Sequence, residues 1–148
     1  MSALERCIAR DEIRQLAYRY AWAIDSRDID LLVSLFVPDV RVGRERTGRA
    51  ALRESWLASL SAIRVSILFV GNHLIDFTDA DHASGGVYCR GQIQDDERWI
   101  EQAIHYRDSY ERRDGEWLFV RRVHRLWYGV ETAVLEPLPT QWQEGDEL

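Results

Sequence analysis

Histidine and aspartate residues in this sequence of 148 residues could carry proton-transfer chemistry. His73 follows the apolar run 65–70, in a segment that alternates as a β-strand does. An imidazole gains and loses a proton near neutral pH, so His73 is a candidate general base. Alternation places His73, Ile75 and Phe77 on one face, which either points into the interior or lies on the outside of the sheet. A purely structural role for His73 stays open.

Asp25 is the second candidate, directly after Ile24 at the end of a predicted helix. A carboxylate at the mouth of a pocket could orient an imidazole and stabilise its charged form. The alternative is an ordinary polar helix end that precedes the predicted N-cap Asp28.

Arg122 is the third candidate, because it lies among the strand-forming residues of LFVRRVHRLW. A buried arginine without a partner is costly, so its guanidinium must reach water or meet an opposite charge. The two-residue period of a strand places Arg122 with His124 on one face, and Arg121 with Arg125 on the other.

The other reactive residue types predict no further site. His82, His105 and His124 have no HxH or HExxH spacing, which argues against a metal site. Cys7 and Cys89 form no CxxC pair, and Cys89 is predicted to fill the core. All 19 basic residues are arginine, which excludes Schiff-base chemistry on a lysine. We expect neither a metal nor an organic cofactor.

The elements that must position these residues are helices first and strands afterwards. Periodicity predicts a helix over 8–24, a short helix after Asp28 and a third helix over 49–63. Strand-like blocks follow at 65–77, 82–94, 98–113 and 116–129. This order predicts an α+β fold in which three N-terminal helices pack on a curved, mostly antiparallel β-sheet and enclose a pocket. We expect one domain over residues 1–148, with 130–148 as a C-terminal tail whose first residues cover the pocket mouth or a neighbouring subunit.

The bulk properties restrict the partners. A net charge of −6 and a pI near 5.2 give no general reason to bind nucleic acid or an anionic membrane. No apolar run reaches the roughly 18 residues of a membrane span, and the charged N-terminus does not fit a signal peptide, so we expect a cytoplasmic protein. We expect the outer sheet face to carry Tyr106, Tyr110, Arg107 and Arg112 and to form a homodimer or homotrimer.

Four blocks of the sequence resemble one family: IRQLAYRYAWAIDSRDIDLLVSLFVPDV, TGRAAL, NHLIDFTDADHASGGVY and YRDSYERRDGEWLFVRR. Together they are similar to the SnoaL-like branch of the NTF2-like superfamily, over about residues 8–128. Within it, the nearest patterns are those of scytalone dehydratase, bile-acid 7α-dehydratase and hexachlorocyclohexane dehydrochlorinase. The resemblance implies the NTF2-like cone with a pocket inside.

The same resemblance implies roles for individual residues. Asp25 and His73 match the Asp–His dyad of these enzymes, Tyr20 matches a pocket tyrosine and Arg122 matches a functional arginine. Tyr20 and Tyr88 would orient substrate oxygens, and Arg122 would stabilise negative charge. The proposed pocket walls, suited to an apolar, aromatic or polycyclic substrate, are Trp22, Trp56, Phe69 and Trp127.

The resemblance leaves several functions open. One is a cofactor-independent lyase, a dehydratase in which the dyad abstracts a proton. Another is an isomerase or cyclase with the same dyad. A third is a non-catalytic binding or scaffold module that resembles a dioxygenase small subunit, with His73 as a structural residue. Gly71 replaces the dehydrochlorinase's cysteine, and 91–94 lack the second histidine of scytalone dehydratase, so no substrate is carried over. Contact between Asp25 and His73 would favour the enzyme.

Overall fold

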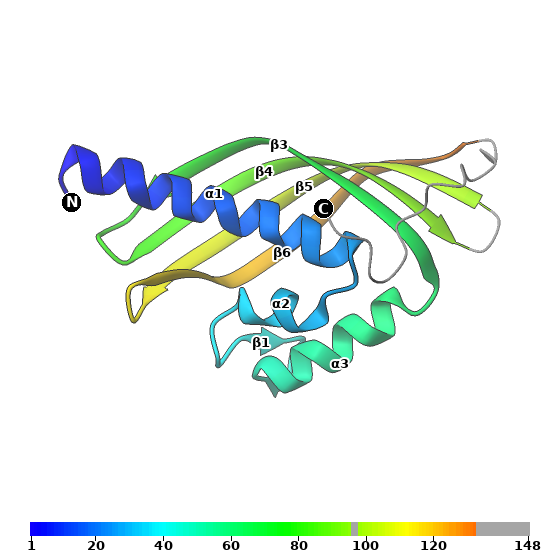
Figure 1. Cartoon of the computed structure of the whole chain (residues 1–148), viewed down its shortest axis with the longest axis horizontal. Helices are drawn as coiled ribbons and strands as arrows, with labels where there is room; N and C mark the ends of the chain where they lie inside the picture. The colour runs from blue at the N-terminus through cyan, green and yellow to red at the C-terminus, as the bar shows by residue number, and fades with distance from the viewer. Residues whose placement is uncertain (96–97, 133–148) are drawn as a thin grey trace.

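The computed structural model describes residues 1–95 and 98–132, and the helices of this part come before a large sheet (Figure 1). The helices are α1 (Ala3–Asp25), α2 (Ile29–Ser34) and α3 (Arg49–Leu60). The strands are β1 (Arg41–Val42), β2 (Arg46–Thr47), β3 (Ile63–Phe77), β4 (His82–Asp95), β5 (Arg98–Arg113) and β6 (Glu116–Thr132). The predicted α+β fold is confirmed.

Helix α1 is longer than predicted because a capping box starts it at residue 3. The Ser2 hydroxyl accepts from the Glu5 backbone N–H at 3.2 Å, and the Glu5 carboxylate accepts from the Ser2 N–H at 2.7 Å. These bonds satisfy N–H groups that a helix start leaves unpaired. The helix ends at Asp25, and Arg27 takes a left-handed φ of 60° that turns the chain.

Arg27 anchors the end of α1 to the start of β3. Its guanidinium donates to the Ser66 hydroxyl at 2.7 Å and to the Ile63 carbonyl at 3.1 Å, and it also bonds the Ile24 carbonyl. The position of Asp25, two residues earlier, is therefore fixed against this part of β3.

The large sheet is an antiparallel meander with the strand order β3-β4-β5-β6. Figure 1 shows α1 lying across one face of this sheet, which we call the inner face, with α2 close to β6 and α3 beside α2. The chain after α2 bonds directly to β6: the Val37 N–H donates to the Phe119 carbonyl and the Phe119 N–H to the Leu35 carbonyl, each at 2.9 Å. The helical segment therefore continues into the sheet's hydrogen-bond pattern.

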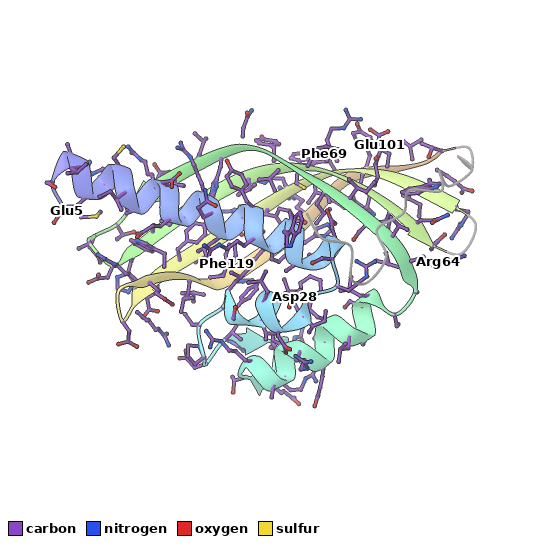
Figure 2. All side chains as sticks on the ribbon, viewed as in Figure 1. Glu5, Asp28, Arg64, Phe69, Glu101 and Phe119 are labelled. Carbon is purple, nitrogen blue, oxygen red and sulfur yellow. The ribbon has the colours of Figure 1, made fainter. Side chains whose placement is uncertain are left out.

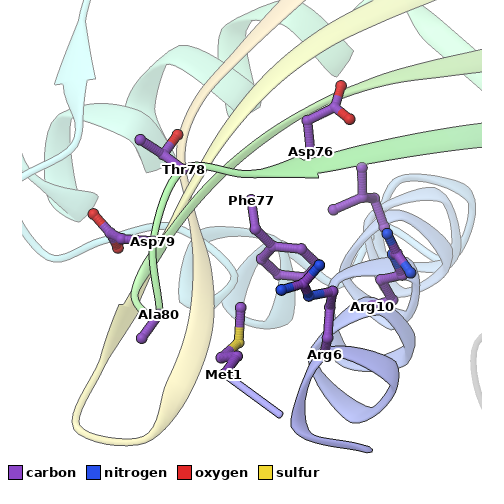
Figure 3. A pocket seen from close by; sticks show the side chains of 9 residues that line it. Met1, Arg6, Arg10, Asp76, Phe77, Thr78, Asp79 and Ala80 are labelled. Atoms are coloured by element: carbon purple, nitrogen blue, oxygen red, sulfur yellow. The ribbon is translucent and has the colours of Figure 1, made fainter. Parts of the chain in front are cut away.

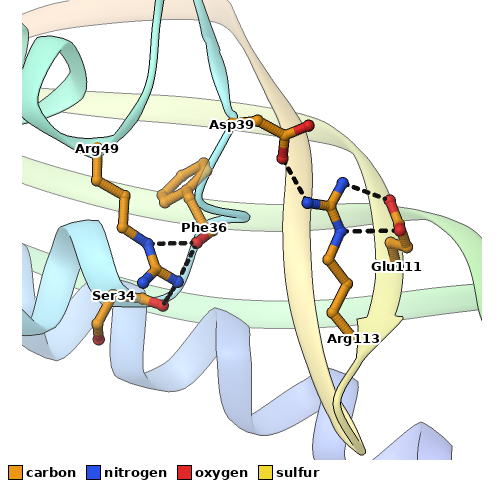
Figure 4. Close-up of polar contacts among 6 residues, drawn as sticks. All are labelled: Ser34, Phe36, Asp39, Arg49, Glu111 and Arg113. Carbon is orange, nitrogen blue, oxygen red and sulfur yellow. Dashed lines mark hydrogen bonds and ion pairs between the residues drawn. The ribbon is translucent and has the colours of Figure 1, made fainter.

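Two arginines join the segments around α2 (Figure 4). The Arg49 guanidinium, at the start of α3, donates to the Phe36 carbonyl at 2.8 Å and to the Ser34 carbonyl at 3.0 Å. Ser34 is the last residue of α2, and a helix end leaves its final carbonyls without helical partners. Arg113, at the end of β5, bonds both Glu111 oxygens and the Asp39 carboxylate.

Two of the four register shifts in the large sheet decide which site side chains face inward. In β3, Val70 pairs with Cys89 but His73 pairs with Val87, so 71–72 contain one extra residue. In β6, Phe119 pairs with Tyr110 but Arg121 pairs with Ser109, so one extra residue lies between them. A bulge reverses the alternation of the strand beyond it. Strict alternation from Phe69 or Phe119 would therefore assign the following residues to the wrong face.

The core lies between α1 and the inner face. Tyr110, Phe119 and Val87 are among its fully buried side chains. Figure 2 labels Phe119 beneath α1, and its ring packs against that of Tyr20 with centroids 6.0 Å apart. Val130–Thr132 continue β6. The remainder of the expected C-terminal cover, 133–138, lies outside the described residues.

Candidate active site

His73 points into the interior because of the bulge at 71–72. Without the extra residue it would share a face with Phe69, which is 63% exposed. The bulge places it on the inner face with Val70 and the buried Ile75. Its Nε2 lies 2.9 Å from the Tyr110 hydroxyl, and its Nδ1 is buried without a partner in the described part of the chain.

Tyr110 connects His73 to a buried ion pair. Its hydroxyl donates to Asp108 Oδ2 at 2.8 Å. Arg122 donates from Nε to Asp108 Oδ1 at 2.9 Å and from Nη2 to Oδ2 at 2.7 Å, in a bidentate pair. The side chains of Arg122 and Asp108 are 3% and 0% exposed. We call His73, Tyr110, Asp108 and Arg122 the inner polar chain.

Aromatic rings surround the guanidinium of this chain. The Cζ of Arg122 lies 4.3 Å from the Tyr20 centroid, 4.2 Å from that of Tyr106 and 4.5 Å from that of Phe119. These cation–π contacts and the Asp108 carboxylate offset the cost of removing the charge from water. The partner that a buried Arg122 was predicted to need is therefore Asp108.

Burial controls protonation in the inner polar chain. It lowers the pKa of His73 to about 4, with Asp108 opposing part of the shift, so the imidazole is neutral at pH 7. Burial and the Asp108 carboxylate raise the pKa of Tyr110, which keeps its hydroxyl protonated. The chain thus combines a neutral base, a neutral phenol and a compensated ion pair.

Asp25 lies in a different part of the interior. Its Oδ2 accepts from the Leu68 backbone N–H at 2.9 Å, and its Oδ1 is buried without a partner in the described part of the chain. Burial raises the pKa of Asp25, while the bonds from Leu68 and Ser66 and the charge of Arg27 act in the opposite direction. Within the described residues, the Asp25 carboxylate therefore uses only one of its two oxygens.

The predicted Asp25–His73 hydrogen bond is not made in this structure. Asp25 bonds Leu68, five residues before His73 on the same strand, which corresponds to roughly 16 Å of extended chain. His73 instead bonds Tyr110. The physical reason is the attachment of α1 through Arg27 to Ser66 and Ile63, which holds the helix end near the start of β3.

Of the predicted pocket residues on the helices, Tyr20 is buried and Trp56 is partly buried. Tyr20 is 4% exposed, and its ring meets that of Trp56 edge-on at 5.9 Å. Trp56 Nε1 is buried and has no partner in the described residues. Trp22 is 48% exposed on α1.

Three predicted pocket residues, Phe69, Tyr88 and Trp127, lie on the outer face instead. Phe69 pairs with Arg90, next to the inward Val70–Cys89 pair. The Tyr88 ring lies against that of His105, tilted by 45° with centroids 4.8 Å apart. Trp127 is 59% exposed and lies beneath the Arg125 guanidinium. The bulge in β3 explains why Phe69 faces outward, because the extra residue places Phe69 and His73 on opposite faces of the strand.

The expected outer-face residues Tyr106 and Tyr110 are buried on the inner face, whereas Arg107 and Arg112 are exposed. Sequence reasoning missed Asp108 and Tyr110 as site residues. The signal was available in Tyr106-x-Asp108-x-Tyr110, since residues two apart share one face of a strand. A carboxylate between two tyrosines on one face indicates an inward-facing polar group. Cys89 fills the core as predicted, at 4% exposure.

A cavity of about 350 Å³ opens between the start of α1 and the end of β3 (Figure 3). Arg6, Arg10, Phe77 and Asp76 contribute to its wall, and Arg10 lies over the Phe77 ring. His73 is not among the residues that line it. This opening is therefore separate from the inner polar chain.

Among residues 1–95 and 98–132, no three histidine, cysteine or acidic side chains gather in a way that could hold a metal ion. None of the helices in those ranges has the length and hydropathy needed to cross a membrane.

Solved structures share this fold over most of the chain. The structure of LinA has a TM-score of 0.81 and 27% identity, and the match covers 94% of this chain and 99% of that one. A LinA Type2 hexachlorocyclohexane dehydrochlorinase has a TM-score of 0.82 and 24% identity over the same shares. A scytalone dehydratase-like protein from Novosphingobium aromaticivorans has a TM-score of 0.78 and 20% identity, over 97% and 100%.

Sequence comparisons give the family. No curated protein sequence matches the chain. A family model for the SnoaL-like domain matches residues 5–123, and the similar structures include enzymes of the dehydrochlorinase kind. The chain belongs to the SnoaL-like domain family, within the NTF2-like superfamily.

Proposed function

We propose that this protein is a cofactor-independent small-molecule lyase of the dehydratase type, with His73 as its general base. One observation carries the proposal: the His73 imidazole, whose lowered pKa keeps it neutral at pH 7, is held through Nε2, while its Nδ1 is buried and has no partner among residues 1–95 and 98–132. A base of this kind suits proton abstraction from carbon, because the neutral ring can take up a proton at pH 7. The structural similarity to LinA supports a lyase-like chemistry. At 27% identity it indicates no particular substrate.

The reaction would run as a proton-coupled elimination. His73 removes a proton from a carbon made acidic by a neighbouring carbonyl or aromatic ring. The electron pair forms the new double bond as the bond from carbon to the departing hydroxyl breaks. The imidazolium returns its proton to that oxygen, which leaves as water. Asp108, acting through Tyr110, stabilises the imidazolium while it exists.

Asp25 has a separate part in this proposal. Its unpartnered oxygen and raised pKa suit a hydrogen bond to a substrate hydroxyl rather than a direct bond to His73. Tyr20 and Trp56 supply aromatic surface for an apolar, aromatic or polycyclic substrate. The same proton abstraction would serve an isomerase or cyclase.

A non-catalytic binding or scaffold module is the second candidate, and the surroundings of Asp25 favour it. The carboxylate meets the backbone of Leu68 rather than an imidazole, and Arg122 is neutralised by Asp108. Such a module would bind apolar ligands without changing them. His73 would then only fill a polar position in the core.

Turnover separates the two candidates. We expect the protein to eliminate water or chloride from at least one member of a panel of hydroxylated and chlorinated cyclic compounds, followed by mass spectrometry. His73→Gln should reduce kcat about 10²–10⁴-fold, which is the usual contribution of a general base. His82→Gln is the control, because His82 is exposed and its ring bonds the nearby Asp79. Ligand binding without turnover would favour the binding module, whereas turnover with an unchanged kcat in His73→Gln would contradict His73 as the general base.

A further inference from the structure

We propose that Tyr110 is a positioning residue that fixes neutral His73 as the Nε2–H tautomer, leaving Nδ1 as the basic atom. The catalytic meaning of this assignment rests on the proposed function, whereas the tautomer itself does not. The assignment follows from counting donors and acceptors along the inner polar chain.

Arg122 ends the inner polar chain, and its guanidinium can only donate hydrogen bonds. Its two N–H groups bond both oxygens of Asp108 at 2.9 and 2.7 Å, so Asp108 is a carboxylate and can only accept. Asp108 Oδ2 also lies 2.8 Å from the Tyr110 hydroxyl. The proton between these two oxygens must therefore belong to Tyr110.

A phenol has a single hydrogen, and Tyr110 gives it to Asp108. Toward His73 the same hydroxyl offers only a lone pair, at 2.9 Å from Nε2. The Nε2 atom must then carry the hydrogen, because two facing lone pairs would leave both atoms unsatisfied inside the protein. In a neutral imidazole this leaves Nδ1 unprotonated.

The opposite arrangement is costly. If Tyr110 donated to His73, its oxygen would face the Asp108 carboxylate with no hydrogen between them. Protonating Asp108 would supply that hydrogen but weaken a bidentate ion pair whose side chains are 3% and 0% exposed. The ion pair therefore fixes the direction of both hydrogen bonds.

The position of Tyr110 depends in turn on Gly85. A Cβ at residue 85 would lie 3.2 Å from the Tyr110 hydroxyl and 2.7 Å from the Leu74 carbonyl. Glycine leaves the space in which the hydroxyl can reach both His73 and Asp108. Nδ1 of His73 is buried and unpartnered within the described residues, so it is the nitrogen left for a proton from a ligand.

Nitrogen-15 NMR of the histidine side chains tests the assignment without any substrate. At pH 7 we expect His73 of the unmodified protein to show a protonated Nε2 and an unprotonated Nδ1, with the signal assigned by its loss in His73→Gln. In Tyr110→Phe we expect a mixture of tautomers, since the lone pair that selects Nε2–H is removed. Tyr88→Phe is the matched control: it removes a hydroxyl beside the outer-face His105, and His73 should not respond.

An Nδ1–H tautomer or an imidazolium in the unmodified protein would overturn the proposal, as would an unchanged His73 signal in a folded Tyr110→Phe. If Tyr110→Phe fails to fold, the tautomer of the unmodified protein decides alone. An Nε2–H tautomer without any turnover would keep the positioning role and defeat only the proposed lyase.

Discussion

The interior joins a neutral imidazole to a buried ion pair through one phenol. Each member is in the form that its neighbour requires: Arg122 keeps Asp108 charged, Asp108 holds the Tyr110 hydrogen, and Tyr110 accepts from His73. Removing one partner should leave an uncompensated charge or an unsatisfied acceptor. Stability and protonation are therefore coupled at these four residues.

Breaking the ion pair should be strongly destabilising. Asp108→Asn is expected to lower the free energy of unfolding by about 3–5 kcal/mol, because Arg122 would stay charged and buried. The double variant Asp108→Leu/Arg122→Met should lose less than this single variant. Arg46→Ala, in an exposed pair with Glu54, should change stability by only about 0–1 kcal/mol. Urea unfolding measures all three, and a loss for Asp108→Asn as small as that for Arg46→Ala would contradict the role of the pair.

Acid should destabilise the protein through His73. Its folded pKa of about 4 lies below the ordinary value of 6.5, so between these pH values the unfolded chain binds the extra proton. The contribution to stability is present above pH 6.5 and is lost as the pH falls toward 4. The raised pKa of Asp25 opposes this loss of stability in acid, and the lowered pKa of His124 adds to it. Both pKa shifts are also present in His73→Gln.

The difference between the two proteins therefore isolates His73. Urea unfolding at pH 7 and pH 5 should show a larger loss in the unmodified protein than in His73→Gln. An equal loss in both would mean that His73 does not resist protonation in the folded state.

The helices and strands position the site residues through β-bulges, a helix cap and the Arg27 contacts with β3. The four long strand blocks were predicted within a few residues, because alternation and turn residues are strong local signals. The side chains that point inward from these strands were predicted less accurately. Strict alternation puts Phe69 with His73, and only pairing with β4 reveals the extra residue at 71–72. Register depends on partners distant in sequence, so the faces of Phe69 and Trp127 could not be derived locally.

The placement of Asp25 failed for a similar reason. A family motif indicates that an aspartate ends the first helix, and this was correct. Where that helix end meets β3 depends on Arg27 bonding Ser66 and Ile63, which is a long-range contact. The start of α1 was available in the sequence, because Ser2 and Glu5 have the spacing of a capping box.

The close approach of β3 and β4 at Gly85 can be tested by overpacking. Gly85→Ala should cost about 1–3 kcal/mol, because its Cβ would meet the Leu74 carbonyl at 2.7 Å and the Tyr110 ring at 3.1 Å. Gly129→Ala in β6 is the control, since its nearest contact is an ordinary 3.5 Å. Thermal unfolding that shifts equally in both variants would contradict the tight fit at Gly85.

At the scale of the whole molecule, helices cover one face of the sheet and leave apolar side chains on the other. On the outer face, Phe69 is 63% exposed, Leu74 73% and Trp127 59%. A monomer seldom leaves several large apolar residues uncovered on one surface. We propose that this face packs against other copies of the chain in a homodimer or homotrimer.

Sedimentation of a charge variant tests this assembly. Phe69→Arg should convert the oligomer to a monomer, because a charge would be buried between the faces. Leu57→Arg is the control, as Leu57 is 51% exposed on α3, away from the sheet face. A monomer for the unmodified protein at micromolar concentration, or an intact oligomer in Phe69→Arg, would rule out this interface.

His73 holds a neutral, half-buried imidazole whose buried Nδ1 can take up a proton, and an NMR titration of this residue is the direct test. Its ring signals should be followed by NMR from pH 8 downward, with the exposed His82 as an internal reference. Burial predicts a midpoint near pH 4 for His73, while the Asp79 carboxylate raises the pKa of His82 above 6.5. A His73 midpoint at or above 6.5 would contradict the claim.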